Sequence, residues 1–209
     1  MENSNFDLTL VDATQLVRLA RDAMKTYLID GREIEPPAGL PESFLQTKGV
    51  FLTLETYPTH EIRGYIGFPY PENPLAYTII RAAIGTAVGD MRFPEIKYEE
   101  LEKIVIRITI TSEPKKITAR EPKSLVKQIV IGRDGLIAQA GRHVARLLPQ
   151  VAVENGWNEE EFLSRLCIHA GLPSYAWQEG KVEISTFSAQ IFEEEKPDGS
   201  VREVKLKTY

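Results

Sequence analysis

The stretch Arg63-Gly64-Tyr65-Ile66-Gly67 is the part of this sequence whose residue types best suit chemistry. Two glycines flank Tyr65 and Ile66. Glycine allows a positive φ or the close approach of another group, which a Cβ would prevent. A guanidinium beside such a backbone, with exposed amides nearby, binds carboxylates or phosphates. The alternative interpretation is that Arg63 pairs with a carboxylate of its own chain over a tight turn, and the sequence leaves both interpretations open.

Two other segments carry side chains that suit the same ligand chemistry. The charged, aromatic turn over residues 90–95 follows the second predicted helix and contains Arg92 and Phe93. The segment over residues 141–150 contains Arg146 and Gln150 and ends at a predicted helix start, where free backbone amides favour anions. A solvated loop is the alternative interpretation of this last segment.

The other reactive residue types form no recognised catalytic or metal-binding pattern. Cys167 and His169 lie two positions apart on a predicted helix, so their side chains point about 200° apart and cannot pair. We therefore interpret Cys167 as an inert thiol of the core. The histidines His60, His143 and His169 form no pair at helical spacing. The sequence thus predicts no metal site and points to no cofactor.

The composition is that of an ordinary globular protein without a dominant charge. The chain has 25 basic and 30 acidic residues, which gives little support to generic nucleic-acid binding through phosphate neutralisation. The single cysteine excludes an internal disulfide and fits a reducing compartment. The first residues, Met1 to Asn5, are polar, and no stretch of about 18 apolar residues occurs. We predict a cytoplasmic protein without a membrane segment.

The spacing of apolar residues predicts helices and strands mixed along the chain. An amphipathic helix is predicted over 9–30, and a second helix runs from residue 73 or 74 to 89. Strands are predicted over 49–55, 62–67 and 102–111, the first two forming a hairpin that ends at the candidate stretch, where Pro69 and Pro71 stiffen the chain. The remaining predicted elements are a hairpin over 129–139 turned by Asp134-Gly135, short helices from Pro149 and Asn158, and a hairpin over 182–207.

These elements occur as hairpins with intervening helices and not as a regular βα alternation. We therefore predict an α+β fold of two lobes with mainly antiparallel sheets flanked by helices. The polar segment over 112–122, which contains two prolines, marks a soft boundary between the lobes. The acidic run Glu193 to Glu195 is expected to be a solvated hairpin edge.

The chain resembles the AMMECR family, named from the Alport syndrome and elliptocytosis chromosomal region, over roughly residues 10 to 193. The resemblance rests on six motifs in the order of the family. They are Lys48-Gly49-Val50-Phe51, Arg63-Gly64-Tyr65-Ile66-Gly67, Asp90-Met91-Arg92-Phe93-Pro94, Gly132-Arg133-Asp134-Gly135-Leu136, Leu147-Leu148-Pro149-Gln150-Val151-Ala152 and Ala170-Gly171-Leu172-Pro173.

The resemblance implies one family domain over residues 1–209 with two antiparallel lobes, and a molecular function that is not established. Tyr65 stands where the family's R-G-C-I-G hallmark has its cysteine, so thiol chemistry at that position is not open to this chain, because a phenol with a pKa near ~10 is a poor substitute. Asp134 stands where the family often has histidine. Family members are joined to, or encoded with, Memo-like and radical SAM proteins, which implies a shared modification pathway.

Three hypotheses follow for the function. The first is a binding or accessory protein in which Arg63, Gly64 to Gly67, Arg92, Phe93, Arg146 and Gln150 line a cleft between the lobes for an anionic or peptide-like ligand. The second is an enzyme of unassigned class in which Tyr65 acts as a proton donor or a hydrogen-bond anchor beside Arg63, with a carboxylate such as Asp90 or Glu95 as the base. The third is a protein-interaction module that uses an exposed apolar patch.

Overall fold

The computed structural model describes residues 8–70, 72–119 and 121–208, which form two compact units. Of the described residues, unit 1 contains 8–70, 72–111 and 190–204, and unit 2 contains 112–119, 121–189 and 205–208. The N-terminal residues Met1 to Asn5, and Pro71 after the candidate stretch, lie outside the described residues.

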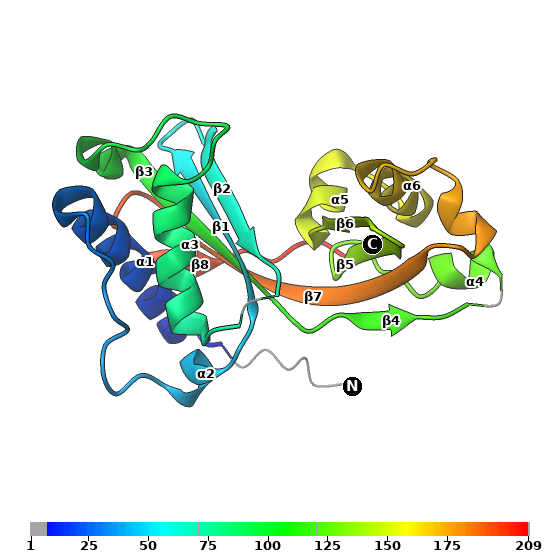
Figure 1. Ribbon diagram of the computed structural model, residues 1–209, viewed down its shortest axis with the longest axis horizontal. Coiled ribbons are helices and arrows are strands. Elements are labelled where there is room, and N and C mark those ends of the chain that lie inside the picture. The colour runs from blue at the N-terminus through cyan, green and yellow to red at the C-terminus, as the bar shows by residue number, and fades with distance from the viewer. Residues whose placement is uncertain (1–7, 71, 120, 209) are drawn as a thin grey trace. The chain divides into compact units, whose positions relative to one another are not determined.

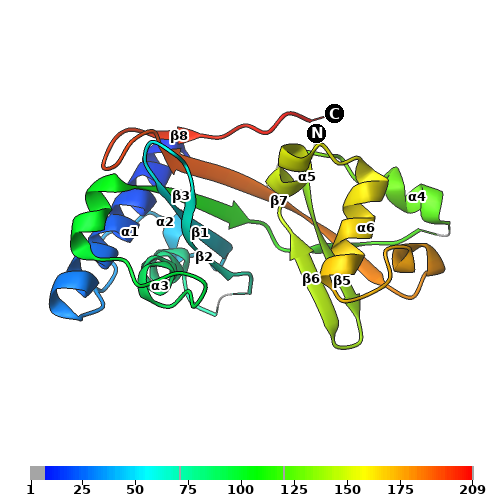
Figure 2. The same cartoon turned by 90° about the horizontal axis from the view of Figure 1, so that it is seen from above.

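Unit 1 is an antiparallel sheet with helices on one face (Figure 1). Its strands lie in the order β2, β1, β3, the end of β7, and β8. Figure 2 shows α1 and α3 on the same side of these strands. The elements are α1 (Leu10–Asp30), α2 (Glu42–Leu45), β1 (Gly49–Thr56), β2 (Ile62–Phe68), α3 (Leu75–Val88), the 3-10 helix η1 (Tyr98–Lys103), β3 (Ile104–Thr111), β7 (Glu183–Glu194) and β8 (Val201–Glu203).

Unit 2 is a smaller antiparallel sheet in which the strands follow the order β6, β5, the first part of β7, and β4. Its elements are β4 (Lys115–Ile117), α4 (Pro122–Val126), β5 (Asp134–Ala140), β6 (His143–Leu147), α5 (Pro149–Asn155), α6 (Glu159–His169) and the 3-10 helix η2 (Ala176–Glu179). Helices and antiparallel strands together confirm the predicted α+β fold class.

Local capping explains where the longest helix begins and ends. The Thr9 hydroxyl accepts the Asp12 N–H at 3.2 Å, and the Asp12 carboxylate accepts the Thr9 N–H at 2.8 Å. These two bonds form a capping box, which satisfies amides that have no partner in the first helical turn. Gly31 ends the helix in the left-handed region with φ 66°, which glycine adopts without a steric penalty. The predicted helix is therefore confirmed.

The sheet of unit 1 buries one face against α1 and α3. Alternate residues of the strands, including Leu52 and Leu54 of β1 and Ile106 of β3, form a core cluster with apolar side chains of the two helices. The contact between β2 and α3 is close, because a Cβ on Gly64 would lie 2.7 Å from the carbonyl oxygen of Thr86. Gly64 is thus required by the approach of the helix backbone.

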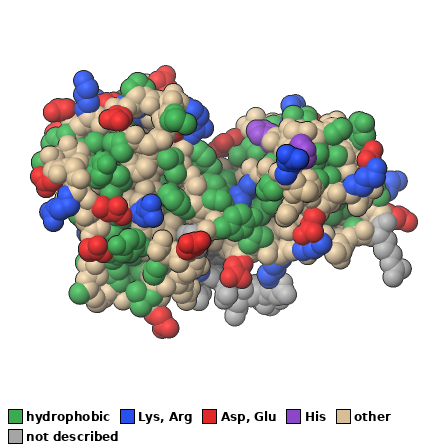
Figure 3. All heavy atoms as spheres, viewed as in Figure 1, with side chains coloured by type: hydrophobic (Ala, Val, Ile, Leu, Met, Phe, Trp, Pro, Cys, Tyr) green, Lys and Arg blue, Asp and Glu red, His purple; other side chains and the backbone are tan. Residues whose placement is uncertain are grey.

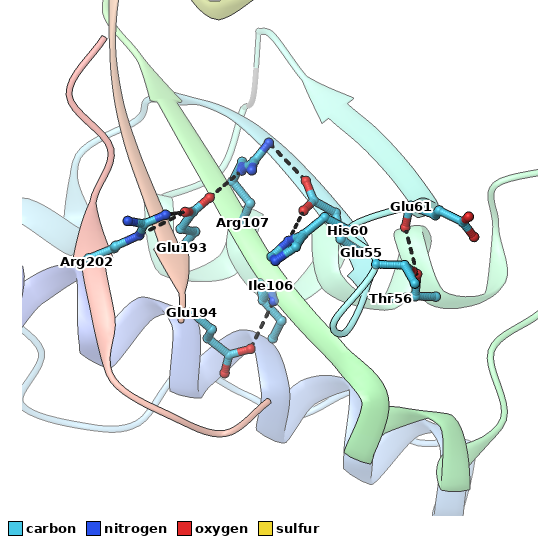
Figure 4. Close-up of polar contacts among 10 residues, drawn as sticks. Glu55, Thr56, His60, Glu61, Ile106, Arg107, Glu193, Glu194 and Arg202 are labelled. Atoms are coloured by element: carbon cyan, nitrogen blue, oxygen red, sulfur yellow. Dashed lines mark hydrogen bonds and ion pairs between the residues drawn. The ribbon is translucent and has the colours of Figure 1, made fainter. Parts of the chain in front are cut away.

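A buried ion pair joins α1 to the end of β7. Arg21 and Glu194 are each 3% exposed, and the Arg21 guanidinium bonds the Glu194 carboxylate and the backbone carbonyls of Leu101 and Ile104. Glu194 also accepts the N–H of Ile106 at 2.9 Å (Figure 4). Because each charged group has several partners, the cost of removing both charges from water is offset.

The predicted hairpin over 129–139 is wrong in its first strand and in its turn. Residues 129–131 form no strand, because the Asp134 side chain accepts the Val130 N–H at 2.9 Å and closes a tight turn that leads directly into β5. The hairpin partner of β5 is β6, in the segment for which a solvated loop was the alternative. The Asp-Gly pair therefore starts a strand and does not connect two strands.

Replacing Glu194 by alanine should lower the free energy of unfolding by about 3–5 kcal/mol, because the buried Arg21 guanidinium would lose its counter-charge. Urea denaturation measures this loss. The matched control is Lys25→Ala, which removes a solvent-exposed pair with Asp198 and should cost less than about 1 kcal/mol. Equal losses for the two variants would contradict the assignment.

Candidate functional site

The free edge of β2 is closed at Tyr65 by two side chains from the turn after α3. β2 pairs with β1 along one edge, and its other edge has no neighbouring strand among the described residues. The Tyr65 N–H donates to Asp90 Oδ2 at 2.9 Å, and Arg92 Nη2 donates to the Tyr65 carbonyl at 2.7 Å. Asp90 and Arg92 thus bond the two groups that a further strand would bond. We call this pair the edge clamp.

The edge clamp is itself held together by charge. Arg92 Nε and Nη2 donate to the two Asp90 oxygens at 2.8 and 2.7 Å. The hydrogen bond from Arg92 holds the pKa of the Asp90 carboxyl well below its usual range, and the Tyr65 N–H adds to this effect against the opposing effect of burial. Asp90 therefore stays ionised at neutral pH and is a poor proton acceptor.

Arg63 fastens the same turn to the start of β2. Its Nη1 donates to the Pro94 carbonyl at 2.7 Å, and its Nε donates to Glu100 Oε2 at 3.1 Å. Nη2 makes longer contacts of 3.3 Å with Glu100 Oε1 and the Glu95 carbonyl. The side chain is 16% exposed. Arg63 therefore pairs with a carboxylate of its own chain, as its alternative interpretation predicted. A direct contact between Arg63 and a ligand stays a prediction.

A row of aromatic and cationic side chains extends from the edge clamp. The rings of Phe51 and Tyr65 stack with centroids 6.1 Å apart. The Arg92 guanidinium carbon lies 5.7 Å from the centroids of both Tyr65 and Phe93, within the range of a cation–π contact. The Phe51 ring also explains Gly67, because a Cβ there would lie 2.3 Å from the ring.

Arg92 has donor capacity left for a ligand. Its side chain is 61% exposed, and within the described part of the chain its Nη1 makes no hydrogen bond. The orientation of the guanidinium is fixed by Asp90 and by the Tyr65 carbonyl. Such a preorganised donor beside aromatic rings suits a carboxylate or carbonyl oxygen.

The predicted residues Arg146 and Gln150 belong to unit 2. Arg146 lies on β6 with its guanidinium carbon 4.8 Å from the Phe187 ring centroid, and Gln150 lies in the first turn of α5. Phe187 covers Gly135 as Phe51 covers Gly67, because a Cβ on Gly135 would lie 2.2 Å from the ring. That these two residues share one site with the unit 1 corner stays a prediction.

The sequence analysis missed a chain of charges on the sheet face away from α1 and α3. Arg107 bonds Glu55 at 2.9 Å and Glu193 at 2.8 Å, and Arg202 also bonds Glu193 (Figure 4). The register places Arg107 beside Thr53. Thr53 in turn pairs with Tyr65, so the chain of charges shares a sheet face with Tyr65. The signal in the sequence that could have indicated these charges was Arg107, a single arginine at an outward position of the isoleucine-rich strand β3.

The prediction of a solvated acidic edge is wrong for two of its three residues. Glu193 and Glu194 are 7% and 3% exposed, and only Glu195 of the run is exposed. Burial opposes ionisation of Glu193, but its bonds to Arg202 and Arg107 outweigh burial and lower its pKa. Partners from distant strands thus allow adjacent carboxylates to be buried.

Other reactive groups offer no second centre in the described parts of the chain. No three histidine, cysteine, aspartate or glutamate side chains converge there in an arrangement that could hold a metal ion. Cys167 lies in the core of unit 2, and burial raises the pKa of its thiol.

No helix within residues 8–70, 72–119 and 121–208 has the length and apolar character to cross a membrane. On the face shown in Figure 3, acidic and basic side chains are interspersed.

Acid should weaken the edge clamp, because the folded state lowers the pKa of Asp90. A lowered pKa gives stability above the pKa of the unfolded chain, and this stability is lost as the pH falls towards the folded-state pKa. We expect the Tm of wild type to exceed that of Asp90→Asn most above about pH 5, with the gap shrinking below about pH 4. The control Asp22→Asn changes an exposed carboxylate of α1 and should give no such gap. A gap for Asp90→Asn that is the same at every pH would contradict this account.

Native Cys167 should resist thiol reagents. Its burial and raised pKa keep the reactive thiolate scarce, so labelling should be at least about 100-fold slower than in the urea-unfolded chain. Absorbance after addition of an aromatic disulfide reagent measures both rates. Equal rates would show that the thiol is accessible in the folded protein.

Comparison with known proteins identifies the family. Residues 17–192 match the AMMECR1 family model. Protein MK0488 of Methanopyrus kandleri is 47% identical over 199 residues, covering 94% of this chain and 95% of the relative. The crystal structure of uncharacterized protein PH0010 from Pyrococcus horikoshii superposes with a TM-score of 0.86 at 44% identity, covering 92% of this chain and 96% of that one. The chain therefore belongs to the AMMECR1 family.

Proposed function

We propose that this protein is a binding or accessory protein that holds an anionic or peptide-like ligand at the corner of unit 1. The corner consists of Arg63, Gly64 to Gly67, Arg92 and Phe93. Within it, Arg92 contacts the ligand, while Arg63 positions the turn that carries Arg92.

The observation that carries this proposal is the state of Arg92. Its guanidinium is oriented by Asp90 and by the Tyr65 carbonyl, yet its side chain is 61% exposed and Nη1 makes no hydrogen bond to the described residues. Tyr65 and Phe93 flank it with aromatic surface. Because Asp90 neutralises much of its charge, Arg92 selects by directed hydrogen bonding more than by long-range attraction.

The enzyme alternative is not favoured. It requires Asp90 or Glu95 as a base beside Tyr65. The Asp90 carboxylate is bonded by Arg92 and by the Tyr65 N–H, and its lowered pKa makes proton capture weak near neutral pH. The Glu95 contact with this corner is made by its backbone carbonyl.

The family context fits an accessory role. The resemblance implies an association with Memo-like and radical SAM proteins. We propose that this protein binds its ligand within a cytoplasmic modification pathway that it shares with them. This context is part of the proposal and supplies no mechanism.

Ligand-induced thermal shifts test the proposal. We expect a member of panels of metabolites, nucleotides and short peptides to raise the Tm of wild type. Arg92→Lys should weaken that ligand at least about 10-fold, because lysine keeps the charge but loses the planar set of donors. The matched control Arg18→Lys changes an exposed arginine of α1 and should keep the full shift.

Two results would overturn the proposal. One is that no compound shifts wild type, and the other is that the shift in Arg92→Lys equals that of wild type. The variant Arg63→Ala tests the positioning role of Arg63. It should lower the Tm of the ligand-free protein and also reduce the shift that the ligand causes.

A further inference from the structure

The edge of β2 next to the edge clamp has open hydrogen-bonding groups. Residues two apart in a strand direct their backbone groups to the same edge, so the N–H and C=O of Gly67 point outwards with those of Tyr65. Tyr65 is bonded by Asp90 and Arg92, whereas Gly67 has no hydrogen bond across this edge to any described residue. This is an edge that an added strand can pair with.

A hollow beside α3 continues from this open edge. Ile66 lies against Gly85 of α3, where a Cβ would be 3.4 Å from the Ile66 side chain. One residue beyond Gly67, a hollow of about 210 Å³ is lined by Phe68, Tyr70, Glu72, Asn73, Thr78 and Arg81. The Arg81 side chain is exposed and makes no ion pair within the described ranges.

We propose that this edge of β2 accepts the C-terminal end of a peptide as an added antiparallel strand, with the terminal carboxylate on Arg92. The inference rests on the proposed function and names the ligand class of that same site. Main-chain pairing at a sheet edge, with a chain end held by a separate donor, is an established mode of peptide recognition.

The direction of the peptide follows from the donors. In an antiparallel pair, the penultimate residue exchanges both main-chain hydrogen bonds with Gly67. The terminal residue then lies opposite Ile66, and its carboxylate, about 3.4 Å further along, meets Arg92. A parallel peptide would bring an ammonium to the guanidinium of Arg92, which is repulsive. An internal segment would run into the edge clamp at Tyr65, because the clamp already bonds that part of the edge.

The faces of β2 assign a neighbour to each peptide side chain, because residues opposite each other share a face. The penultimate side chain faces the rings of Phe51 and Tyr65. The terminal side chain faces Ile66 and Gly85, and the preceding one lies opposite Phe68 above the hollow that contains Arg81. The site thus favours an aromatic or aliphatic penultimate residue and a polar residue two positions from the end.

The test uses the full chain and a displayed library of hexapeptides with free C-termini. Fluorescence polarisation then compares the best synthetic peptide with its C-terminal amide. We expect amidation to weaken binding at least about 10-fold. We also expect the NMR signal of the Gly67 amide to shift and its hydrogen exchange to slow when the free acid is bound.

A pair of variants at one position checks the groove. Gly85→Leu projects a side chain over Ile66 without removing a contact of the fold and should weaken the peptide at least about 10-fold. Gly85→Ala, which adds only a Cβ, should bind within about 2-fold of wild type. Thermal unfolding of both variants shows that the fold is retained.

The outcomes separate this inference from the proposed function. If the acid and the amide bind equally, or if the Gly67 amide does not respond, the strand-addition inference is wrong while ligand binding at Arg92 stands. If small anions shift the Tm through Arg92 but no peptide binds, the inference is likewise overturned. If neither peptides nor small anions bind, both the proposed function and the strand-addition inference are wrong.

Discussion

The backbone of an edge strand must have hydrogen-bond partners, and at Tyr65 of β2 the partners are the side chains of Asp90 and Arg92. The same turn is fastened through Pro94 and Glu95 by Arg63. Two motifs that are separate in sequence thus become one structural corner. This corner closes part of the sheet edge against unspecific pairing and orients a guanidinium towards solvent, which is the basis of the function proposed for it.

The sheet of unit 1 has buried charged side chains on both faces. On each face, these side chains pair with groups from several elements. On the helical face, Arg21 and Glu194 satisfy each other and three backbone groups. On the other face, Arg107 lies between Glu55 and Glu193 (Figure 4). Removing one partner from such a set leaves an uncompensated charge, so these residues form a rigid frame for Tyr65 and its neighbours.

The sequence analysis named residues that the structure brings together at the corner of unit 1, and that this corner binds a ligand stays a prediction. Gly64 and Gly67 were recognised because glycine permits close approach, and each has such a neighbour, Thr86 for the first and Phe51 for the second. The individual roles were not predictable. Arg63 makes structural bonds and Arg92 retains a donor, although both are arginines within family motifs. What separates them is which backbone carbonyls lie within reach.

The sequence by itself determined where the long helix α1 begins and ends, the antiparallel α+β class and the family. These follow from signals within a few residues, such as the Thr9 and Asp12 capping box and the alternation of β3. Only the tertiary structure decided the partners of the charged groups. Arg63 meets a carboxylate 37 positions away and Arg21 one 173 positions away. Such pairs depend on strand order and register, which no local pattern specifies.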